Sequence, residues 1–578
     1  MPEQRNLILA IVLSVTIILA FQYFYELPRI QEAQRQQERQ QETATETEAT
    51  PRPQPATPGD TVAPSVPGSA VPAPERRAQA LRESERIDFT NGRVEGSVAL
   101  RGGRIDDLTL SDYQVSQEPG APDVTLLSPP AAPSTYFAEF GWVPAEQGVD
   151  VPARDTLWQA DQPTFGADDA VTLRWTNDAG LTFVREIRLD QNYMFTVTQR
   201  VENTGEDPVT LHPYALISRW GTPPTLGFFI LHEGPIGVLQ GQLEEIDYDD
   251  LRDDGDIRLE STGGWLGITD KYWLSALIPD QDRELKATFR HHVAGGQDRY
   301  QVDYLHPPLT VAPGATAEVT DRFFAGAKEV NLLDRYAEQL GIPLFDRAVD
   351  FGWFYFLTKP IFHVLHYFYL LAGNYGVAIL LLTLVVKLLF YPLANKSYRA
   401  MSKMKKLQPE MMRLREQYGD DKARMNQELM ALYKNEKVNP MSGCLPIIVQ
   451  IPVFFALYKV LFVSIEMRHA PFFGWIQDLS APDPTSIFNL FGLLPFDPPG
   501  FLMIGVWPLI MGATMLLQFK LNPQPADPMQ ARIMMLLPLM FIFLFATFPA
   551  GLVIYWTWNN ILSIGQQWLI MRRAGVSV

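Results

Sequence analysis

A lysine lies within an apolar stretch of this chain, and this combination limits what the chain can fold into. The stretch runs from Gly376 to Leu393, and the ten residues from Val377 to Val386 carry no charge and one hydroxyl, that of Thr383. At about 1.5 Å of rise per residue, a helix of this length crosses most of a bilayer. Lys387 follows, although a charge at a helix centre costs roughly 2.5–3.5 kcal/mol on insertion scales. The pattern predicts a transmembrane helix whose lysine faces a wet cavity and has a function.

A second interpretation of Lys387 stays open. A lysine near a helix end can stretch its ammonium group to the membrane surface, where it would only anchor the topology. The next charge along the chain, Lys396, is nine residues away. That separation is about 13 Å of helix, of which the lysine stem covers only a part. The distance favours the wet cavity.

Charge is divided unevenly along the 578 residues. Residues 26–352 hold 28 Lys and Arg against 53 Asp and Glu, a net charge of −25, whereas the remainder holds 20 against 12, a net charge of +8. An acidic block joined to an apolar, basic block predicts a soluble domain outside a membrane and a body inside it. The single cysteine, Cys444, excludes an internal disulfide framework and a cysteine-rich metal site.

The acidic block has the pattern of β-structure. Alternating runs such as 181–189 and 193–201 lie between turn signals such as Asn91-Gly92 and Gly263-Gly264. About 240 residues with little helical periodicity predict a large β-sandwich. The block contains no His-Glu-x-x-His motif, no nucleophile elbow and no phosphate-binding loop, so we expect no catalysis there.

A basic segment follows the lysine-bearing stretch. Residues 396–437 hold eleven Lys and Arg against six acids, with apolar residues at helical spacing. Gly419 as a helix stop and Asp421 as an N-cap predict an antiparallel helical hairpin, and the basic excess predicts a cytoplasmic location. The charges either serve topology alone or form a docking arm for clients and the ribosome. For the docking arm the predicted residues are Lys403, Lys405, Lys406, Arg413 and Arg415.

Six apolar segments are predicted to span the membrane, and the placement of Lys and Arg puts both chain termini in the cytoplasm. An aromatic-rich amphipathic helix before the second span is expected to lie in the membrane interface. The predicted segments are a cytoplasmic N-terminus (1–6), a transmembrane anchor (7–25), a flexible Pro-rich tether (26–86), the β-sandwich (87–326), linker and interfacial helices (327–373), five further spans (374–395, 445–465, 501–519, 533–548 and 552–571), the cytoplasmic hairpin (396–440), an outer loop (466–500), a cytoplasmic loop (520–532) and a cytoplasmic tail (572–578).

Polar residues recur within the predicted spans. Thr383 lies one turn before Lys387 on the same helix face, Gln450 lies in the third span, and the last span carries Asn559, Asn560, Ser563, Gln566 and Gln567. Each alone is explained as a contact between helices. Together with Lys387 they predict a polar groove.

Long motifs in the chain carry a resemblance to a known family. The motifs are QRNL (4–7), RGG (101–103), GGW (263–265), NYG and YPL (within 374–393), KMKKLQP (403–409), GDDK and MALYK (within 419–434), VNPMSGCLPIIVQIPVFFALY (438–458), R-x-A-P-F (468–472), DPMQ (527–530) and FPAGLVIYW (548–556). On these motifs the chain resembles the YidC/Oxa/Alb family of membrane protein insertases, in its proteobacterial form, over nearly its whole length.

The resemblance implies a fold and a site. The outer domain would be a periplasmic β-supersandwich of the sugar-mutarotase type, and five conserved spans would form a hydrophilic groove open to the cytoplasm and the lipid. The family's groove cation is usually arginine, and Lys387 stands at the matching position, where it keeps the charge but loses the bidentate fork. Trp556 stands where tyrosine is common. The implied groove residues are Lys387, Thr383, Gln450, Tyr555, Trp556, Asn560 and Ser563.

The resemblance also implies a function, which is the insertion and folding of integral membrane proteins in the bacterial inner membrane. The implied partners are nascent membrane proteins, the Sec translocon (SecYEG and SecDF), the ribosome and the lipid bilayer. We expect no enzyme activity, no cofactor and no sequence-specific binding of nucleic acid, and the chain has no Walker motif. A groove would shorten the path over which polar groups must cross hydrocarbon.

Two other functional classes stay open. A transporter or channel could use Lys387 as its ion site, although the sequence has no inverted repeat of discontinuous helices. A membrane-anchored sugar-binding or envelope-processing protein would instead act through the β-domain.

Overall fold

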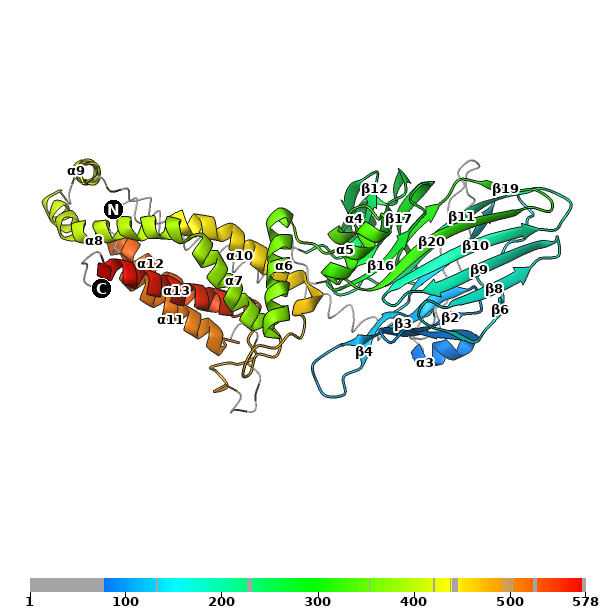
Figure 1. Cartoon of the computed structure of the whole chain (residues 1–578), viewed down its shortest axis with the longest axis horizontal. Coiled ribbons are helices and arrows are strands. Elements are labelled where there is room, and N and C mark those ends of the chain that lie inside the picture. The colour runs from blue at the N-terminus through cyan, green and yellow to red at the C-terminus, as the bar shows by residue number, and fades with distance from the viewer. Residues whose placement is uncertain are drawn as a thin grey trace.

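The structure is a computed structural model that describes residues 77–573, except 131, 133, 226–230, 353, 419–420, 437, 439–444, 492–493, 495, 497, 500–502 and 523–527. The predicted N-terminus, the anchor (7–25), the tether up to residue 76 and the tail after residue 573 lie outside the described residues. The described chain is elongated, with a β-sandwich at one end and a helical body at the other (Figure 1).

Two large sheets form the sandwich, as the alternating runs predict. The first follows the order β14 (Ile257–Thr262), β17 (Glu284–Ala294), β18 (Gln297–Leu305), β11 (Val209–Trp220), β5 (Tyr136–Pro144), β3 (Arg104–Gln114), β2 (Val94–Ala99), β1 (Arg86–Thr90) and β7 (Thr164–Phe165), with β19 (Leu309–Val311) on β11 and β4 (Asp123–Leu127) on β3. The second follows the order β13 (Gln242–Glu245), β12 (Gly234–Leu239), β15 (Trp265–Thr269), β16 (Trp273–Ile278), β20 (Thr316–Ala327), β10 (Met194–Asn203), β9 (Leu181–Leu189), β8 (Ala170–Thr176) and β6 (Gln159–Ala160).

The alternation of buried and half-buried residues along the strands shows where the core of the sandwich lies. Along β10 buried and half-buried residues alternate, and β9 pairs with it in antiparallel register, Val197 opposite Ile187. Phe195 of β10 packs edge-on against Phe89 of β1, with ring centroids 5.3 Å apart, so the inner faces of the two sheets interdigitate. At the predicted turn, Gly264 has φ +93°, and a Cβ there would lie 2.1 Å from the carbonyl oxygen of Val238, so only glycine fits.

The sequence predicts a flexible tether up to residue 86, but helical structure already begins at Arg77. Residues 77–83 form a short helix, α3 (Arg77–Ala80), and one 3₁₀ turn (Leu81–Glu83). Arg77 pairs with Asp107 of β3, and Ala80 is buried. The prediction was wrong here because this ion pair and this burial come from a strand distant in sequence.

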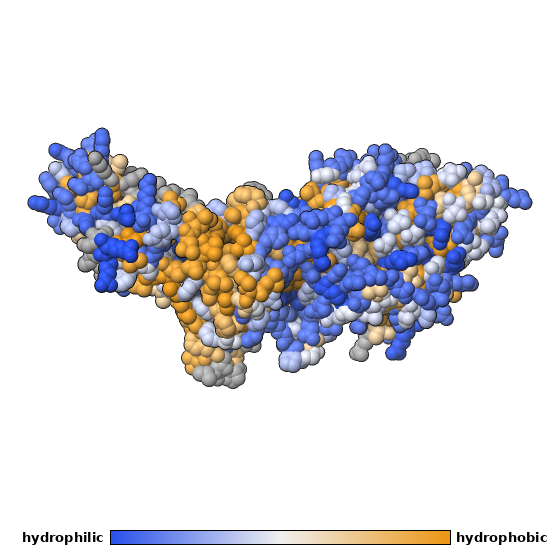
Figure 2. Space-filling model, viewed as in Figure 1, coloured by the Kyte–Doolittle hydropathy of each residue, from blue (hydrophilic) through white to orange (hydrophobic). Residues whose placement is uncertain are grey.

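Apart from α3 before the sandwich and α4 (Tyr248–Asp254) within it, the helices follow the sandwich. They are α5 (Val330–Gln339), α6 (Tyr355–Ala372), α7 (Tyr375–Leu389), α8 (Tyr391–Tyr418), α9 (Lys422–Asn435), α10 (Leu445–Val463), α11 (Val506–Leu521), α12 (Pro528–Phe545) and α13 (Ala550–Arg573). Figure 1 shows α10 to α13 lying roughly along the long axis, with α6 crossing it at the end near the sandwich. The surface of this body carries a broad apolar band, in contrast to the polar sandwich (Figure 2).

The predicted span 374–395 is divided in two. Helix α7 ends at Leu389, α8 begins at Tyr391, and the two axes differ by 68°. Pro392 explains the break, because it has no N–H to continue the ladder and its ring clashes with the preceding turn. Judged by length and composition, no single helix among the described residues suffices to cross a membrane, whereas α7 and α8 together do as a bent pair.

Other helix bounds differ from the predictions at their ends. The helix expected at 501–519 begins at Val506, where Thr485 and Asp483 from the preceding loop accept hydrogen bonds from the N–H groups of Val506 and Trp507 at 3.0 and 2.9 Å. These distant acceptors satisfy N–H groups that a helix start leaves free. The loop expected at 520–532 is shorter, because α12 already begins at Pro528.

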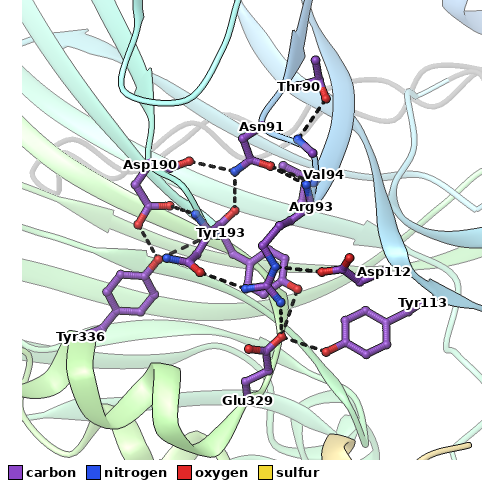
Figure 3. A network of polar contacts seen from close by, with 12 residues as sticks. Thr90, Asn91, Arg93, Val94, Asp112, Tyr113, Asp190, Tyr193, Glu329 and Tyr336 are labelled. Atoms are coloured by element: carbon purple, nitrogen blue, oxygen red, sulfur yellow. Dashed lines mark hydrogen bonds and ion pairs between the residues drawn. The ribbon is translucent and has the colours of Figure 1, made fainter.

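A polar network stabilises the junction between the sandwich and the body. The Glu329 carboxylate, at the start of α5, pairs with Arg93 and accepts hydrogen bonds from the hydroxyls of Tyr113 (2.8 Å) and Tyr193 (3.2 Å) (Figure 3). Arg93 also pairs with Asp112 at 2.8 Å. Strand β3 and the residues just before β2 and β10 therefore hold Glu329, the N-cap of α5, in place.

The next residue of α5 contacts the body directly. The N–H of Val330 donates to the carboxylate of Glu466 at 2.9 Å, just after α10. The carboxylate is buried, and this desolvation raises the pKa of Glu466 to about 7. Nearby, Gln117 of the sandwich donates to the carbonyl of Gln477 at 2.8 Å, and Arg468 donates to that of Val115 at 3.3 Å. The two parts are thus packed together and not merely tethered.

Candidate functional site

Helix α7 sets the position of Lys387. Its N-cap is Asn374, whose side chain accepts a hydrogen bond from the N–H of Val377 at 3.0 Å, and the commonest residue of its interior is leucine, a strong helix former. Thr383, one turn before Lys387, is 1% exposed and donates its hydroxyl to the carbonyl of Ile379 at 2.7 Å. The threonine therefore faces packed helices, and Lys387 lies in the last turn, beside α13.

Lys387 contacts a hydroxyl and no acid. Its ammonium donates to the hydroxyl of Ser563 on α13 at 2.6 Å, and that hydroxyl donates to the carbonyl of Asn559 at 2.8 Å. Within the described part of the chain no ion pair joins Lys387 to an acid. A hydroxyl orients an ammonium group without neutralising it, so the positive charge stays available to an anion.

A second polar contact lies one turn away on α13. The amide of Gln450 on α10 donates to the side-chain oxygen of Asn559. Tyr555 is 1% exposed, and its hydroxyl lies beside Gln450. Residues 555, 559 and 563 are spaced by four, so they form one row on α13 that faces α7 and α10. We call Lys387, Gln450, Tyr555, Asn559 and Ser563 the polar cluster.

The remaining predicted residues lie elsewhere. Asn560 donates to the hydroxyl of Thr514 on α11 at 3.1 Å, and Gln567 donates to Asn522 at 3.0 Å, so these amides join α13 to α11. Trp556 packs among aromatic rings, with centroids 4.8 Å from Phe454 and 5.4 Å from Phe545. The structure brings Lys387, Gln450, Tyr555 and Ser563 together and places Asn560 and Trp556 outside the cluster.

Asn559 was predicted in the polar groove but was not among the residues that the resemblance implied, and Tyr398 was not predicted as a site residue. Asn559 joins both contacts of the cluster, and its spacing of four from Ser563 was the available signal. Tyr398 of α8 is buried against Met401 and Ile570, with its hydroxyl beside Ser563. The signal for Tyr398 was weak, because its position depends on the bend between α7 and α8.

The basic helices lie at the far end of the body from the sandwich (Figure 1). Asp421 caps α9 as predicted, accepting from the N–H of Arg424 at 3.1 Å, and the hydroxyl of Tyr433 on α9 contacts the sulfur of Met411 on α8 at 3.7 Å. Of the predicted docking residues, Lys403, Lys406 and Arg413 are exposed, and Lys405 and Arg415 are half-buried. Met412 and Met430 are 56% and 63% exposed, so apolar and basic surface adjoin here.

No group of three or more His, Cys, Asp or Glu side chains suited to a metal ion occurs among the described residues. The polar cluster itself consists of one ammonium group, two amides and two hydroxyls, which act by electrostatic attraction and hydrogen bonding. It can attract a negative charge and can offer amide and hydroxyl groups to a polar chain segment.

Comparison with known proteins identifies the family of this chain. The family model described as the YidC periplasmic domain matches residues 86–364, and the model described as the 60Kd inner membrane protein matches residues 367–576. The membrane protein insertase YidC of Methylobacterium radiotolerans is 49% identical, over 100% of this chain and 96% of the relative. The chain belongs to the YidC family of membrane protein insertases. The YidC insertase of Granulibacter bethesdensis is 51% identical, over 99% of this chain and 98% of the relative.

Membership of the YidC family makes the sandwich a periplasmic domain, the helical part an inner membrane body, and the chain an insertase of membrane proteins. The structural match to a crystal structure of an active YidC insertase covers 84% of this chain and 92% of the crystallised chain, with 18% sequence identity and a TM-score of 0.35. The assignment to the YidC family rests on the sequence relatives and not on that likeness.

Proposed function

We propose that the polar cluster lines a hydrophilic groove that receives the polar tail of a client during insertion. The observation that carries the proposal is that Lys387, inside an otherwise apolar helix, contacts a hydroxyl and no acid among the residues that the structure describes. Burying a charge without a partner is costly, so its retention requires hydration or a transient anion. An acidic client tail supplies that anion, and the amides of Gln450 and Asn559 offer hydrogen bonds to the tail backbone.

The driving force comes from the client. Its own apolar segment moves from the groove into lipid, which lowers its free energy without a nucleotide. The groove shortens the hydrocarbon path of the tail, and each unpaired polar group spared that path saves several kcal/mol. The basic helices α8 and α9 receive the client, and the ribosome and the Sec translocon are its sources. The groove opens to the cytoplasm and the lipid and is closed toward the periplasm.

Site-specific photo-crosslinking to a nascent membrane protein tests the groove. Gln566 is placed one turn beyond Ser563 on the same side of α13, whereas Ile561 faces the opposite side by helical spacing and is 42% exposed. A crosslinker at Gln566 is expected to capture the client tail more strongly than one at Ile561. Equal capture at both positions would contradict a groove on this face.

The proposed topology places six spans in the membrane, with both termini and the basic helices in the cytoplasm, since Lys and Arg mark cytoplasmic loops. Single cysteines in a Cys444→Ser background test this. Lys403→Cys, on the exposed face of α8, is expected to react with a membrane-impermeant maleimide only after the cells are opened. Thr176→Cys, on the exposed rim of the sandwich, is expected to react in cells with a permeabilised outer membrane. Reaction of the Lys403→Cys variant from the periplasm would overturn the topology.

A further inference from the structure

The connection between α10 and α11 carries a concentrated apolar surface. Residues 486–496 contain no Asp, Glu, Lys or Arg. Five large apolar side chains of this segment are exposed, by these fractions: Phe488 43%, Leu490 53%, Phe491 51%, Leu494 41% and Phe496 51%. Exposed apolar residues grouped in this way mark a surface that meets lipid or another protein.

The exposure of these residues is built into the fold of the segment. Leu490 and Phe491 have φ of +51° and +59°, a left-handed conformation that bulky residues rarely adopt. The conformation is held by hydrogen bonds from the N–H of Phe491 to the carbonyl of Ser486 at 2.7 Å and from that of Leu494 to Asn489 at 3.0 Å. Asn489 is only 8% exposed, so the polar side chain points inward while its apolar neighbours point outward.

The base of the segment is fixed to the helical body. Asp483 is 3% exposed and accepts hydrogen bonds from the indole of Trp475 at 3.1 Å and from the N–H of Trp507, in the first turn of α11, at 2.9 Å. Ser486 is fully buried. A rigid base and an apolar tip are the arrangement of an anchor, because the base fixes the height at which the tip lies.

The position of the tip favours lipid as its partner. Figure 1 shows this connection extending sideways from the end of the body that faces the sandwich, close to where α6 runs into α7. The outward face of α6 is also apolar, since Phe356, Leu370 and Leu371 are 75%, 68% and 66% exposed. Two predominantly apolar surfaces at one level along the body fit a single plane, that of a membrane interface.

We infer that the five exposed side chains, those of Phe488, Leu490, Phe491, Leu494 and Phe496, insert into the periplasmic leaflet of the bilayer, as a second interfacial anchor beside α6. The inference rests on the proposed topology, which places this connection on the periplasmic side. The anchor fixes the depth of the helical body in the membrane, and with it the height of the polar cluster. A client segment or a second copy of the chain would be the competing occupants.

Nitroxide labels on single cysteines test the inference in vesicles of phosphatidylethanolamine and phosphatidylglycerol. Phe488→Cys and Leu490→Cys, each with Cys444→Ser, are compared with Thr176→Cys on the sandwich rim. Labels at 488 and 490 are expected to collide with dissolved oxygen severalfold more, and with a water-soluble nickel complex severalfold less, than the label at 176. Insertion activity equal to that of the Cys444→Ser parent confirms that each variant is folded.

Two results would overturn the inference. Equal access of the nickel complex to positions 488, 490 and 176 would place the segment in water. Low access of both reagents to positions 488 and 490 would mean that protein covers the segment. A failure of the topology is recognised separately, by the maleimide labelling of Lys403→Cys and Thr176→Cys. An inverted topology changes which of these two cysteines reacts from the periplasm, but it leaves the lipid exposure of positions 488 and 490 unchanged.

Discussion

Lys387→Glu is expected to abolish the insertion of clients with acidic translocated tails. Two unit charges 4 Å apart interact by about 4 kcal/mol at an effective dielectric constant of about 20, so reversal of the sign turns an attraction of this order into a repulsion. Lys387→Ala is expected to weaken insertion of acidic-tail clients more than that of neutral-tail clients. Lys387→Arg keeps the charge, adds a fork that matches carboxylates and is expected to stay active.

The measurement is the insertion of one client made in acidic-tail and neutral-tail versions. Ser563→Ala is the matched control, because it removes the hydroxyl that orients Lys387 and keeps the charge; a loss smaller than that of Lys387→Ala is expected. If Lys387 is only a topology anchor, Ala is tolerated by both clients and any defect is one of orientation. Equal loss for both versions with correct topology would favour hydration of the groove over attraction of the tail.

Removal of the outer part of the basic helices is the second change with a large expected effect. Deletion of residues 404–436, bridged by a short Gly-Ser linker, keeps the packing of Tyr398 and Met401 on Ile570. The helical body is therefore expected to fold and to reach the membrane, but insertion of single-span clients is expected to be lost. Crosslinking of the client to α13, together with insertion of the deleted protein into the membrane, separates loss of function from loss of folding.

A charge-reversal variant tests the basic side chains separately from the helices that carry them. Reversal of Lys403, Lys406 and Arg413 to Glu alters exposed side chains only and keeps good helix formers. If the basic face receives clients, this variant loses insertion while its α-helical content stays that of the parent. If the variant that lacks residues 404–436 still inserts clients normally, these helices serve only to set the topology of the chain.

Patterns within one element allowed most of the fold to be predicted. Alternation along β9 and β10 predicted the sandwich, and the N-cap at Asp421 predicted the start of α9. The bend after Leu389 was missed although Pro392 was visible, because the apolar run continues through the break. The start of the sandwich at Arg77 was missed because its ion pair partner lies thirty residues along the chain.

The sequence predicted what kind of site the chain contains, but it predicted less well which residues belong to that site. Asn559 and Asn560 are adjacent in the sequence, yet successive helix positions point about 100° apart. One amide therefore joins the polar cluster and the other joins α11, and only the neighbours of α13 decide which. The contact between Lys387 and Ser563 connects residues 176 positions apart, which no local pattern encodes.

The contact of Val330 with Glu466 has a mechanical consequence. Glu466 follows the end of α10 by three residues, and α10 carries Gln450 of the polar cluster. The periplasmic domain is thus connected, through α10 and past its internal Pro452, to the amide that contacts Asn559. We therefore expect that a partner that tilts the sandwich also displaces α10 relative to α13, and with it the contact between Gln450 and Asn559.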